Sequence, residues 1–340
     1  MTRTLVLSYA VSRKLDTPRI VVFGYSDLGV VCLQQLLDRG ANVVAVVTHR
    51  DDPGESIWFG SVAALAVSRN IPVHTPDDPN VPAFVEEIRG LRPDLIFSFY
   101  YRHMLSPALL AIPRLGAINL HGSLLPKYRG RAPINWVLVH GETTTGVTLH
   151  HMDARADRGD IIAQRAVPIA IEDTALTLSR KLTATARTLL AEMYPLIAAG
   201  RAPRVPQDHG AATKVRRRTP GDGLIDWSRS AWQIYNLIRA VTHPFPGAFT
   251  FWDGRRVFLW FALPPGTQAC EMPPGTILGV GDGGAINVAT GRGILGVTRI
   301  QPQEGPEMDG PTFFAALPRG RVTHFESATA EVVGEGRRDT

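Results

Sequence analysis

In this chain of 340 residues, a side chain that could stabilise a negative charge lies two residues from one that could transfer a proton. Asn119 and His121 follow an apolar run at residues 116–118. In extended backbone, side chains two residues apart leave on the same face, so this amide and this imidazole reach one place. A loop containing Pro126 comes next, and then a basic turn with three cations: Lys127, Arg129 and Arg131.

A carboxylate, Asp157, lies in a charged turn within a predicted hairpin further along the chain. A carboxylate that orients a histidine favours its charged form and makes the imidazole a useful general acid or base. An amide N–H beside it can stabilise an oxyanion. The sequence places no nucleophilic Ser or Cys in an elbow, so this set favours direct attack of a substrate amine on a carbonyl carbon.

Other interpretations of the same residues are weaker. A histidine at a strand end is more often a structural hydrogen-bonding group than a catalyst. Ser123 lacks the GxSxG elbow of a hydrolase, and the sequence offers no HExxH or CxxC frame for a metal site. His150 and His151 are adjacent in a predicted strand, so at most one of them reaches a shared site. The three cations of the turn, and the run at residues 216–218, could equally be solvated surface.

The elements that position these residues form an α/β pattern. Continuous apolar strands alternate with helices, which is typical of a parallel sheet. The predicted strands cover residues 20–23, 42–48, 71–74, 94–100 and 117–120, and the predicted helices cover residues 30–39, 61–69, 82–89 and 107–112. The first turn, residues 24–29, misses the GxGxxG spacing of a dinucleotide site, so we interpret it as a structural turn. Two successive strands deliver polar loops at their carboxyl ends, where open α/β sheets bind ligands.

The second half of the chain reads differently. A hairpin at residues 146–169 and a long helix at 174–199 complete the first unit, and a Pro- and Arg-rich stretch follows. Short strands with turn signals then predict a small β-barrel. We expect an N-terminal extension at residues 1–18, a catalytic domain at 19–205, a linker at 206–221, a barrel domain at 222–325 and a flexible tail at 326–340.

Composition is that of a soluble globular protein, with 44% hydrophobic and 20% charged residues. No apolar run approaches the length of a membrane span, and we interpret the first residues as an extension and not as a signal peptide. The net charge of +5 permits an anionic partner, but no long basic block indicates a nucleic-acid arm. Cys32 and Cys270 are expected to be thiols in a reducing compartment, which favours a cytoplasmic location.

Two blocks carry a family resemblance: NLHGSLLPKYRGRAPINW at residues 119–136 and GVTLHHMDARADRGDI at 146–161. Shorter matches are FGSVAALA, FSFYYRHML, RRTPGDGLIDW and HPFPGAFT. Together they resemble the formyltransferases that use 10-formyltetrahydrofolate, with the nearest likeness to the ArnA-type UDP-4-amino-4-deoxy-L-arabinose formyltransferase domain. The resemblance covers residues 19–300. It implies a Rossmann-like formyltransferase domain followed by a small OB-like barrel, in agreement with the pattern of elements.

The resemblance also implies roles for individual residues. His121 would be the general acid/base, Asn119 would hold the oxyanion of the formyl group, and Asp157 would favour the charged form of His121. The formyl donor would be 10-formyltetrahydrofolate, with no metal. Its expected contacts, several of them through backbone, are His103, Met104, Leu105, Arg131, Asp153, Ala154, Arg155, Ala156 and Asp157.

The sequence says less about the formyl acceptor than about the formyl donor. The resemblance implies a primary amine on a nucleotide-linked 4-amino sugar, while hydroxyornithine in siderophore synthesis and initiator methionyl-tRNA are alternatives. A tRNA substrate needs a larger basic surface, so nucleic acid is the less favoured partner. The chain has Thr213, Lys214 and Val215 before RRTPGDG, where related enzymes carry an aromatic-glycine element. A homodimer and a non-catalytic folate-binding module are further possibilities.

Overall fold

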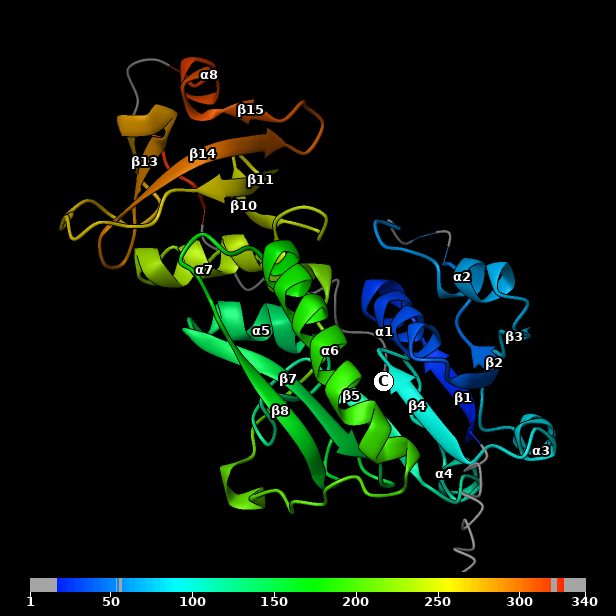
Figure 1. The fold of residues 1–340 in the computed structure, drawn as a ribbon. Helices are drawn as coiled ribbons and strands as arrows, with labels where there is room; N and C mark the ends of the chain where they lie inside the picture. Colours follow the sequence, from blue (N-terminus) through cyan, green and yellow to red (C-terminus); the bar gives the residue numbers. More distant parts are fainter. Residues whose placement is uncertain (1–16, 53, 55–56, 319–322, 327–340) are drawn as a thin grey trace, which may run out of the picture.

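The computed structural model describes residues 17–52, 54, 57–318 and 323–326. Most of the expected N-terminal extension and all but one residue of the expected tail lie outside this range. Two β-sheets, each with its own helices, lie side by side and are joined by residues 199–230 (Figure 1). Among the described residues, no helix is both long enough and apolar enough to cross a membrane.

The first sheet has seven strands in the order β3-β2-β1-β4-β5-β7-β8. The first five run parallel, whereas β7 and β8 form an antiparallel hairpin added to the β5 edge. The sheet is therefore the predicted α/β sheet, extended by the predicted hairpin. Its strands are β1 (Arg19–Gly24), β2 (Asn42–Val47), β3 (Val73–His74), β4 (Leu95–Phe99), β5 (Ala117–His121), β7 (Thr144–His151) and β8 (Ile161–Pro168).

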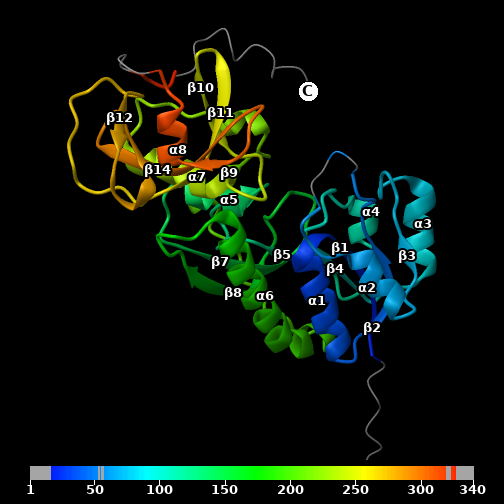
Figure 2. The same cartoon turned by 90° about the horizontal axis from the view of Figure 1, so that it is seen from above.

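Both faces of this sheet are covered by helices, as Figure 2 shows from above. The helices are α1 (Ser26–Asp38), α2 (Val62–Ser68), α3 (Pro82–Gly90), α4 (Pro107–Leu110), α5 (Pro133–Val139) and α6 (Ala175–Ala198). Successive side chains of a strand point to opposite faces. Ile20 and Val22 of β1 accordingly join the core beneath α1, α2 and α6, while Val21 and Phe23 join the core beneath α3 and α4. This explains why the strands are continuously apolar.

The predicted turn at residues 24–29 is wrong in extent, because α1 begins at Ser26 and contains Gly29. A Cβ atom on Gly29 would lie 2.9 Å from the Val62 side chain. Gly29 therefore permits close packing of α1 on α2, and it is not a turn signal. Helix α5, which begins inside the basic segment, was also missed, because its N-cap Ala132 has left-handed backbone and Pro133 reads as a loop residue.

The second sheet is antiparallel, in the order β10-β11-β14-β13-β12, with β15 paired to β14. Residues 323–326 bridge its two edges, since Glu326 N–H donates to the Phe251 carbonyl and Phe325 N–H to the Gly275 carbonyl. This bridging closes the sheet toward the predicted barrel. Its elements are α7 (Ala231–Val241), β10 (Ala248–Trp252), β11 (Arg255–Ala262), β12 (Ile277–Val280), β13 (Ile286–Ala289), β14 (Ile294–Pro302), β15 (Met308–Asp309) and α8 (Gly310–Ala315).

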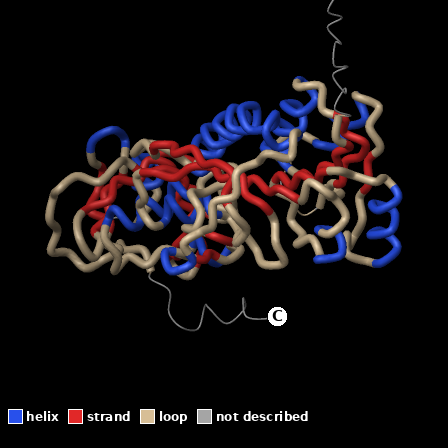
Figure 3. Tube along the Cα trace, turned by 60° about the horizontal axis from the view of Figure 1, so that its bottom comes forward, coloured by secondary structure: helices blue, strands red, loops and turns tan. Residues whose placement is uncertain are grey.

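The stretch expected to be a linker is ordered against the first sheet's loops. Strand β9 (Lys214–Val215) pairs in parallel with β6 (Arg129–Gly130), which belongs to the basic turn. Short 3-10 turns at His209–Ala211 and Pro220–Gly223 flank it, and α7 packs against α5. Figure 3 shows the strands of both sheets within one elongated molecule. The connection between the sheets is thus part of the surroundings of the predicted site.

Candidate functional site

Strand β5 ends at the residues that the sequence singled out. Asn119 lies opposite His150 of β7 in the register, and His121 lies opposite Thr148. His121 is 6% exposed and Asn119 is partly buried. The loop after β5 is held in place because Thr148 Oγ1 donates to the Ser123 carbonyl at 2.6 Å. Ser123 is fully buried and donates to the Lys127 carbonyl, which excludes it as a nucleophile.

Both ring nitrogens of His121 face oxygen atoms. Nε2 lies 2.8 Å from the carbonyl oxygen of Tyr128, and Nδ1 lies 3.5 Å from Asp157 Oδ1. A carbonyl oxygen only accepts hydrogen bonds, so Nε2 carries the hydrogen. Nδ1 is therefore the nitrogen that can gain or lose a proton, and it does so beside a carboxylate. The predicted pairing of His121 with Asp157 is present in the structure.

Asp157 is held rigidly in an unusual backbone conformation. Its φ is +55°, a left-handed value that Asp tolerates better than most residues. Its Oδ2 accepts a hydrogen bond from the Gly130 N–H at 2.8 Å. Burial alone would raise the pKa of Asp157, but the nearby imidazole of His121 and the Gly130 N–H hold that pKa well below its usual range. The Asp157 carboxylate is therefore ionised at neutral pH.

A second imidazole completes this group. His150 Nε2 lies 3.0 Å from Asn119 Nδ2 and 3.6 Å from Asp157 Oδ1. His151 points to the other face, where its Nε2 lies 3.1 Å from the Pro203 carbonyl. The expectation that at most one of these histidines reaches the site is confirmed. Sequence reasoning did not decide between the two histidines, and only the register of β5 with β7 places His150 beside Asn119.

Gln207, from the expected linker, is a site residue that sequence reasoning missed. Its Nε2 donates to the backbone carbonyls of Asp157 and Gly159, at 3.0 and 2.7 Å. Its Oε1 accepts from Arg129 Nε and Nη2, at 3.2 and 2.6 Å. Arg129 is only 3% exposed, so the interpretation of this cation as solvated surface is wrong. No local sequence signal marks this network, because its members come from three separate segments.

The residues expected to contact the donor lie on two loops. His103 and Met104 are exposed at the carboxyl end of β4, whereas the Leu105 side chain is 2% exposed and packs in the core. Only the backbone of Leu105 can therefore take part. Arg131 is exposed, and its Nη2 donates to the Arg102 carbonyl at 2.6 Å. This bond links the loop after β4 to the loop after β5.

The second loop surrounds Asp157 itself. Asp153 turns the chain by accepting a hydrogen bond from the Arg155 N–H at 2.7 Å. Ala154, Arg155 and Ala156 are exposed. Within the described part of the chain, the backbone N–H groups of the two alanines have no hydrogen-bond acceptor. The loop thus presents a small-residue surface with free backbone donors next to Asp157.

Of the remaining cations in the two basic segments, Lys127 and Arg217 are exposed, whereas Arg216 and Arg218 contact other side chains. Arg216 forms an ion pair with Asp222. Arg218 lies over the Trp136 ring, 4.7 Å from its centre, and donates to the Asp222 carbonyl at 2.8 Å. The interpretation of residues 216–218 as solvated is therefore wrong for Arg218, which packs on Trp136, whereas Arg216 is exposed and paired with Asp222.

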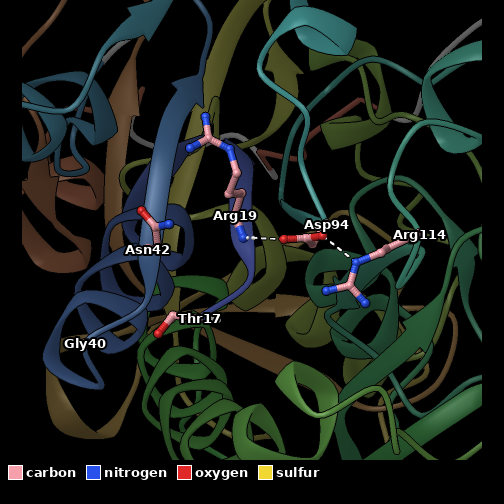
Figure 4. A pocket seen from close by; sticks show the side chains of 6 residues that line it. All are labelled: Thr17, Arg19, Gly40, Asn42, Asp94 and Arg114. Atoms are coloured by element: carbon pink, nitrogen blue, oxygen red, sulfur yellow. Dashed lines mark hydrogen bonds and ion pairs between the residues drawn. The ribbon is translucent and has the colours of Figure 1, made fainter. Parts of the chain in front are cut away.

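One hollow, of about 640 Å³, lies at the amino ends of the strands, away from these residues (Figure 4). Arg19, Asp94 and Arg114 line it and are joined by hydrogen bonds. A second hollow of about 330 Å³ lies at the carboxyl ends of β1 and β2, lined by Tyr25, His49 and Phe59 among others. Within the described ranges, no three His, Cys, Asp or Glu side chains converge as metal ligands.

Solved structures of sugar formyltransferases share this fold. One is the N-formyltransferase from Helicobacter canadensis with folinic acid and dTDP-3-aminofucose, 21% identical, covering 82% of this chain and 98% of that chain with a TM-score of 0.65. Another is WlaRD, a sugar 3N-formyltransferase in the presence of dTDP and 5-N-formyl-THF, at 20% identity, 85% and 99% coverage and TM-score 0.62. A sugar N-formyltransferase from Shewanella sp FDAARGOS_354 is 18% identical, with 71% and 96% coverage and TM-score 0.59.

Family models match both parts of the chain. The formyl transferase model matches residues 18–193, and the model of the formyl transferase C-terminal domain matches residues 217–318. The first match alone covers more than half of the sequence. The resemblance to this family is confirmed, whereas the nearer likeness to the ArnA-type domain stays a prediction. The chain belongs to the formyltransferase family.

Proposed function

We propose that this protein transfers a formyl group from 10-formyltetrahydrofolate to the primary amine of a nucleotide-linked amino sugar, of the UDP-4-amino-4-deoxy-L-arabinose type. The observation that carries the proposal is the convergence of Asn119, His121 and Asp157 at the carboxyl end of β5. These three groups meet the needs of amine attack on a carbonyl: a base, a charge that stabilises its protonated form, and a donor for the oxyanion.

His121 takes the proton from the attacking amine at Nδ1. Its Nε2–H is already bonded to the Tyr128 carbonyl, so Nδ1 is the free basic position. The ionised carboxylate of Asp157, 3.5 Å away, stabilises the imidazolium that forms. The same proton then passes to the nitrogen that leaves the formyl carbon, so His121 ends the reaction neutral. Such proton transfers contribute about 10²- to 10⁴-fold to the rate.

Asn119 donates an N–H to the formyl oxygen as it gains negative charge. The amide comes from a strand that is paired on both sides, by β4 and β7, so it moves little during the reaction. A donor fixed before the reaction costs no reorganisation in the transition state. Loss of one such donor lowers kcat by about 10²- to 10³-fold.

The loops around the site fit the formyl donor. 10-Formyltetrahydrofolate, when bound, supplies the activated formyl group. His103 and Met104 present an exposed surface on one loop, and the free N–H groups of Ala154 and Ala156 line the other. Backbone donors of this kind suit the flat, polar ring of a pterin. Arg131 would hold the loops together through the Arg102 carbonyl.

The hollow at the carboxyl ends of β1 and β2 supports a nucleotide-linked acceptor. Its aromatic and charged lining, including Tyr25, Arg50 and Phe59, suits a base and its phosphates. It lies two to three strand positions from β5, about 10–14 Å at the usual strand spacing. A nucleotide sugar has its base and its amino sugar separated by a diphosphate, which matches a separation of this order.

The test is release of tetrahydrofolate from 10-formyltetrahydrofolate in the presence of UDP- and dTDP-linked amino sugars, hydroxyornithine or charged initiator tRNA. We expect turnover with an amino-sugar nucleotide. We expect Asn119→Ala, His121→Ala and Asp157→Ala each to lower kcat at least about 100-fold, while the control His243→Ala, in the second domain, stays near wild type. Turnover with tRNA or hydroxyornithine alone would refute the acceptor, and full activity in the three variants would refute the mechanism.

A further inference from the structure

We propose that His150 is a positioning residue, which holds the Asn119 amide so that one N–H remains directed at the formyl oxygen. This inference rests on the proposed function. It begins from the side-chain contact between β5 and β7, where Asn119 Nδ2 and His150 Nε2 are 3.0 Å apart. His150 does not reach the reacting atoms itself in this proposal, and it acts only through Asn119.

The hydrogen-bond partners of His150 define its tautomer. Nδ1 lies 2.8 Å from the carbonyl oxygen of His151, and a carbonyl cannot donate, so Nδ1 carries the hydrogen. In the neutral ring Nε2 is then an acceptor, and the Asn119 amide donates to it. The amide nitrogen has two hydrogens, so one remains free for a substrate oxygen. The imidazole thereby determines which edge of the Asn119 amide faces the substrate.

The distances at Nε2 fit this hydrogen-bond pattern. The cationic ring would direct an Nε2–H toward Asp157 Oδ1, but that distance is 3.6 Å, longer than the contact with Asn119. His121 Nδ1 faces the same oxygen at 3.5 Å. One buried carboxylate can compensate one imidazolium, and a second buried positive charge would be costly. An amide nitrogen only donates, so the short contact assigns Nε2 of His150 as the acceptor from Asn119.

Burial makes the arrangement specific. His150 is 2% exposed, so bulk water does not replace its contact with Asn119. If Nε2 carried a proton, the amide would have to turn its carbonyl oxygen toward the ring. The N–H groups would then leave their present direction, and the donor for the oxyanion would be misplaced. A displacement of about 1 Å in such a group can lower the rate by about 100-fold.

The kinetic test compares two substitutions on one scaffold. His150→Phe keeps the ring and removes the acceptor, and we expect it to lower kcat about 10- to 100-fold with little change in KM for the amino-sugar nucleotide. His150→Gln supplies an amide oxygen near the position of Nε2, and we expect it to restore most of the activity. His151→Phe is the matched control, since it removes a buried imidazole from the same strand on the opposite face.

A double-mutant cycle separates positioning from a general structural effect. In the Asn119→Ala background, His150→Phe should slow the reaction by no more than about twofold, because the residue it positions is gone. Losses that multiply would overturn the proposal, and so would a His150→Phe enzyme as active as wild type.

A further measurement does not require turnover. In protein with ¹⁵N-labelled histidine at pH 7.5, the resonances that disappear in His150→Gln should show a protonated Nδ1 and a non-protonated Nε2. A protonated Nε2 would overturn the proposal even if the enzyme formylates the expected acceptor. If turnover were found only with another acceptor, a non-protonated Nε2 would still support the positioning role of His150. Failure of this proposal and failure of the proposed acceptor are therefore distinguishable.

Discussion

Replacing Gln207 with alanine tests whether the segment between the two sheets belongs to the site. Gln207 is 7% exposed and makes four hydrogen bonds. Two of them are donated to the carbonyls of Asp157 and Gly159, and two are accepted from Arg129. Gln207→Ala therefore leaves two carbonyls and one buried guanidinium without these partners.

The expected cost follows from these groups. A buried group that loses its partner costs about 1–3 kcal/mol, and a charged one is at the upper end, so the three groups together lower the free energy of unfolding by about 3–5 kcal/mol. The first sheet and its helices are a domain of the size for which 1 kcal/mol shifts the melting temperature by about 2–4 °C. The smallest expected loss of about 3 kcal/mol then lowers its melting temperature by about 6–12 °C. Release of the Asp157 backbone should also lower kcat about 10- to 100-fold.

Differential scanning calorimetry and the formyl-transfer assay measure the two effects. Gln207→Glu separates the two halves of the network, because a carboxylate still accepts from Arg129 but cannot donate to the two carbonyls. We expect it to lose activity as Gln207→Ala does. The control is Gln303→Ala, an exposed residue of the second domain, with an expected change within about 0.5 kcal/mol. A Gln207→Ala protein that melts and turns over like wild type would refute this reasoning.

Three further changes have outcomes that the structure defines. Gly130 has a φ of +107°, and a Cβ there would lie 2.2 Å from the Val215 carbonyl, so Gly130→Ala should separate β6 from β9 and lower the urea midpoint by the equivalent of about 3 kcal/mol or more; an unchanged midpoint would show that this contact does not constrain the turn. The pKa of Asp157 is lowered in the folded protein, so its contribution to stability is present above the unfolded pKa of about 3.9 and is lost as pH falls through the folded value. The stability deficit of Asp157→Asn, about 1–3 kcal/mol, should thus be full near pH 7 and shrink below about pH 4, and a deficit that grows toward low pH would contradict the assignment. Tyr128 Oη donates to Glu142 Oε1 at 2.6 Å, so Tyr128→Phe should lower the free energy of unfolding by about 1–2 kcal/mol in urea titrations, with no loss expected if the hydroxyl were solvated.

The sequence was sufficient to predict the parallel sheet and the pair of residues at its edge. The continuous apolar strands indicated burial on both faces of the sheet. The two-residue spacing of Asn119 and His121 indicated that their side chains point to the same face. Asp157 was linked to His121 by its place in a charged turn within the predicted hairpin and by the family resemblance, and in the structure the two side chains do face each other. These features depend on local pattern, which a single sequence records.

Other features of the site depend on contacts between distant segments, and no local pattern records them. Arg129 looked like a surface cation because most arginines are exposed. It is buried because β9, more than 80 positions later, pairs with β6 and brings Gln207 over it. Residues 206–221 looked like a linker because they belong to a stretch rich in Pro, Arg and Gly, and such residues also suit a segment that follows the surface of another domain closely.

The boundary of the first sheet and the boundary of the site are therefore different. The domain that contains the first sheet ends with α6. Asp157 accepts a hydrogen bond from Gly130 of β6, and its backbone carbonyl accepts one from Gln207, which follows that helix. Its left-handed backbone costs about 1–2 kcal/mol, a strain that persists only when the surroundings supply more than this. The surroundings are the pairing of β6 with β9 and the four hydrogen bonds of Gln207. The position of the carboxylate beside two imidazoles is thus a property of the connection between the domains as much as of the domain that carries it.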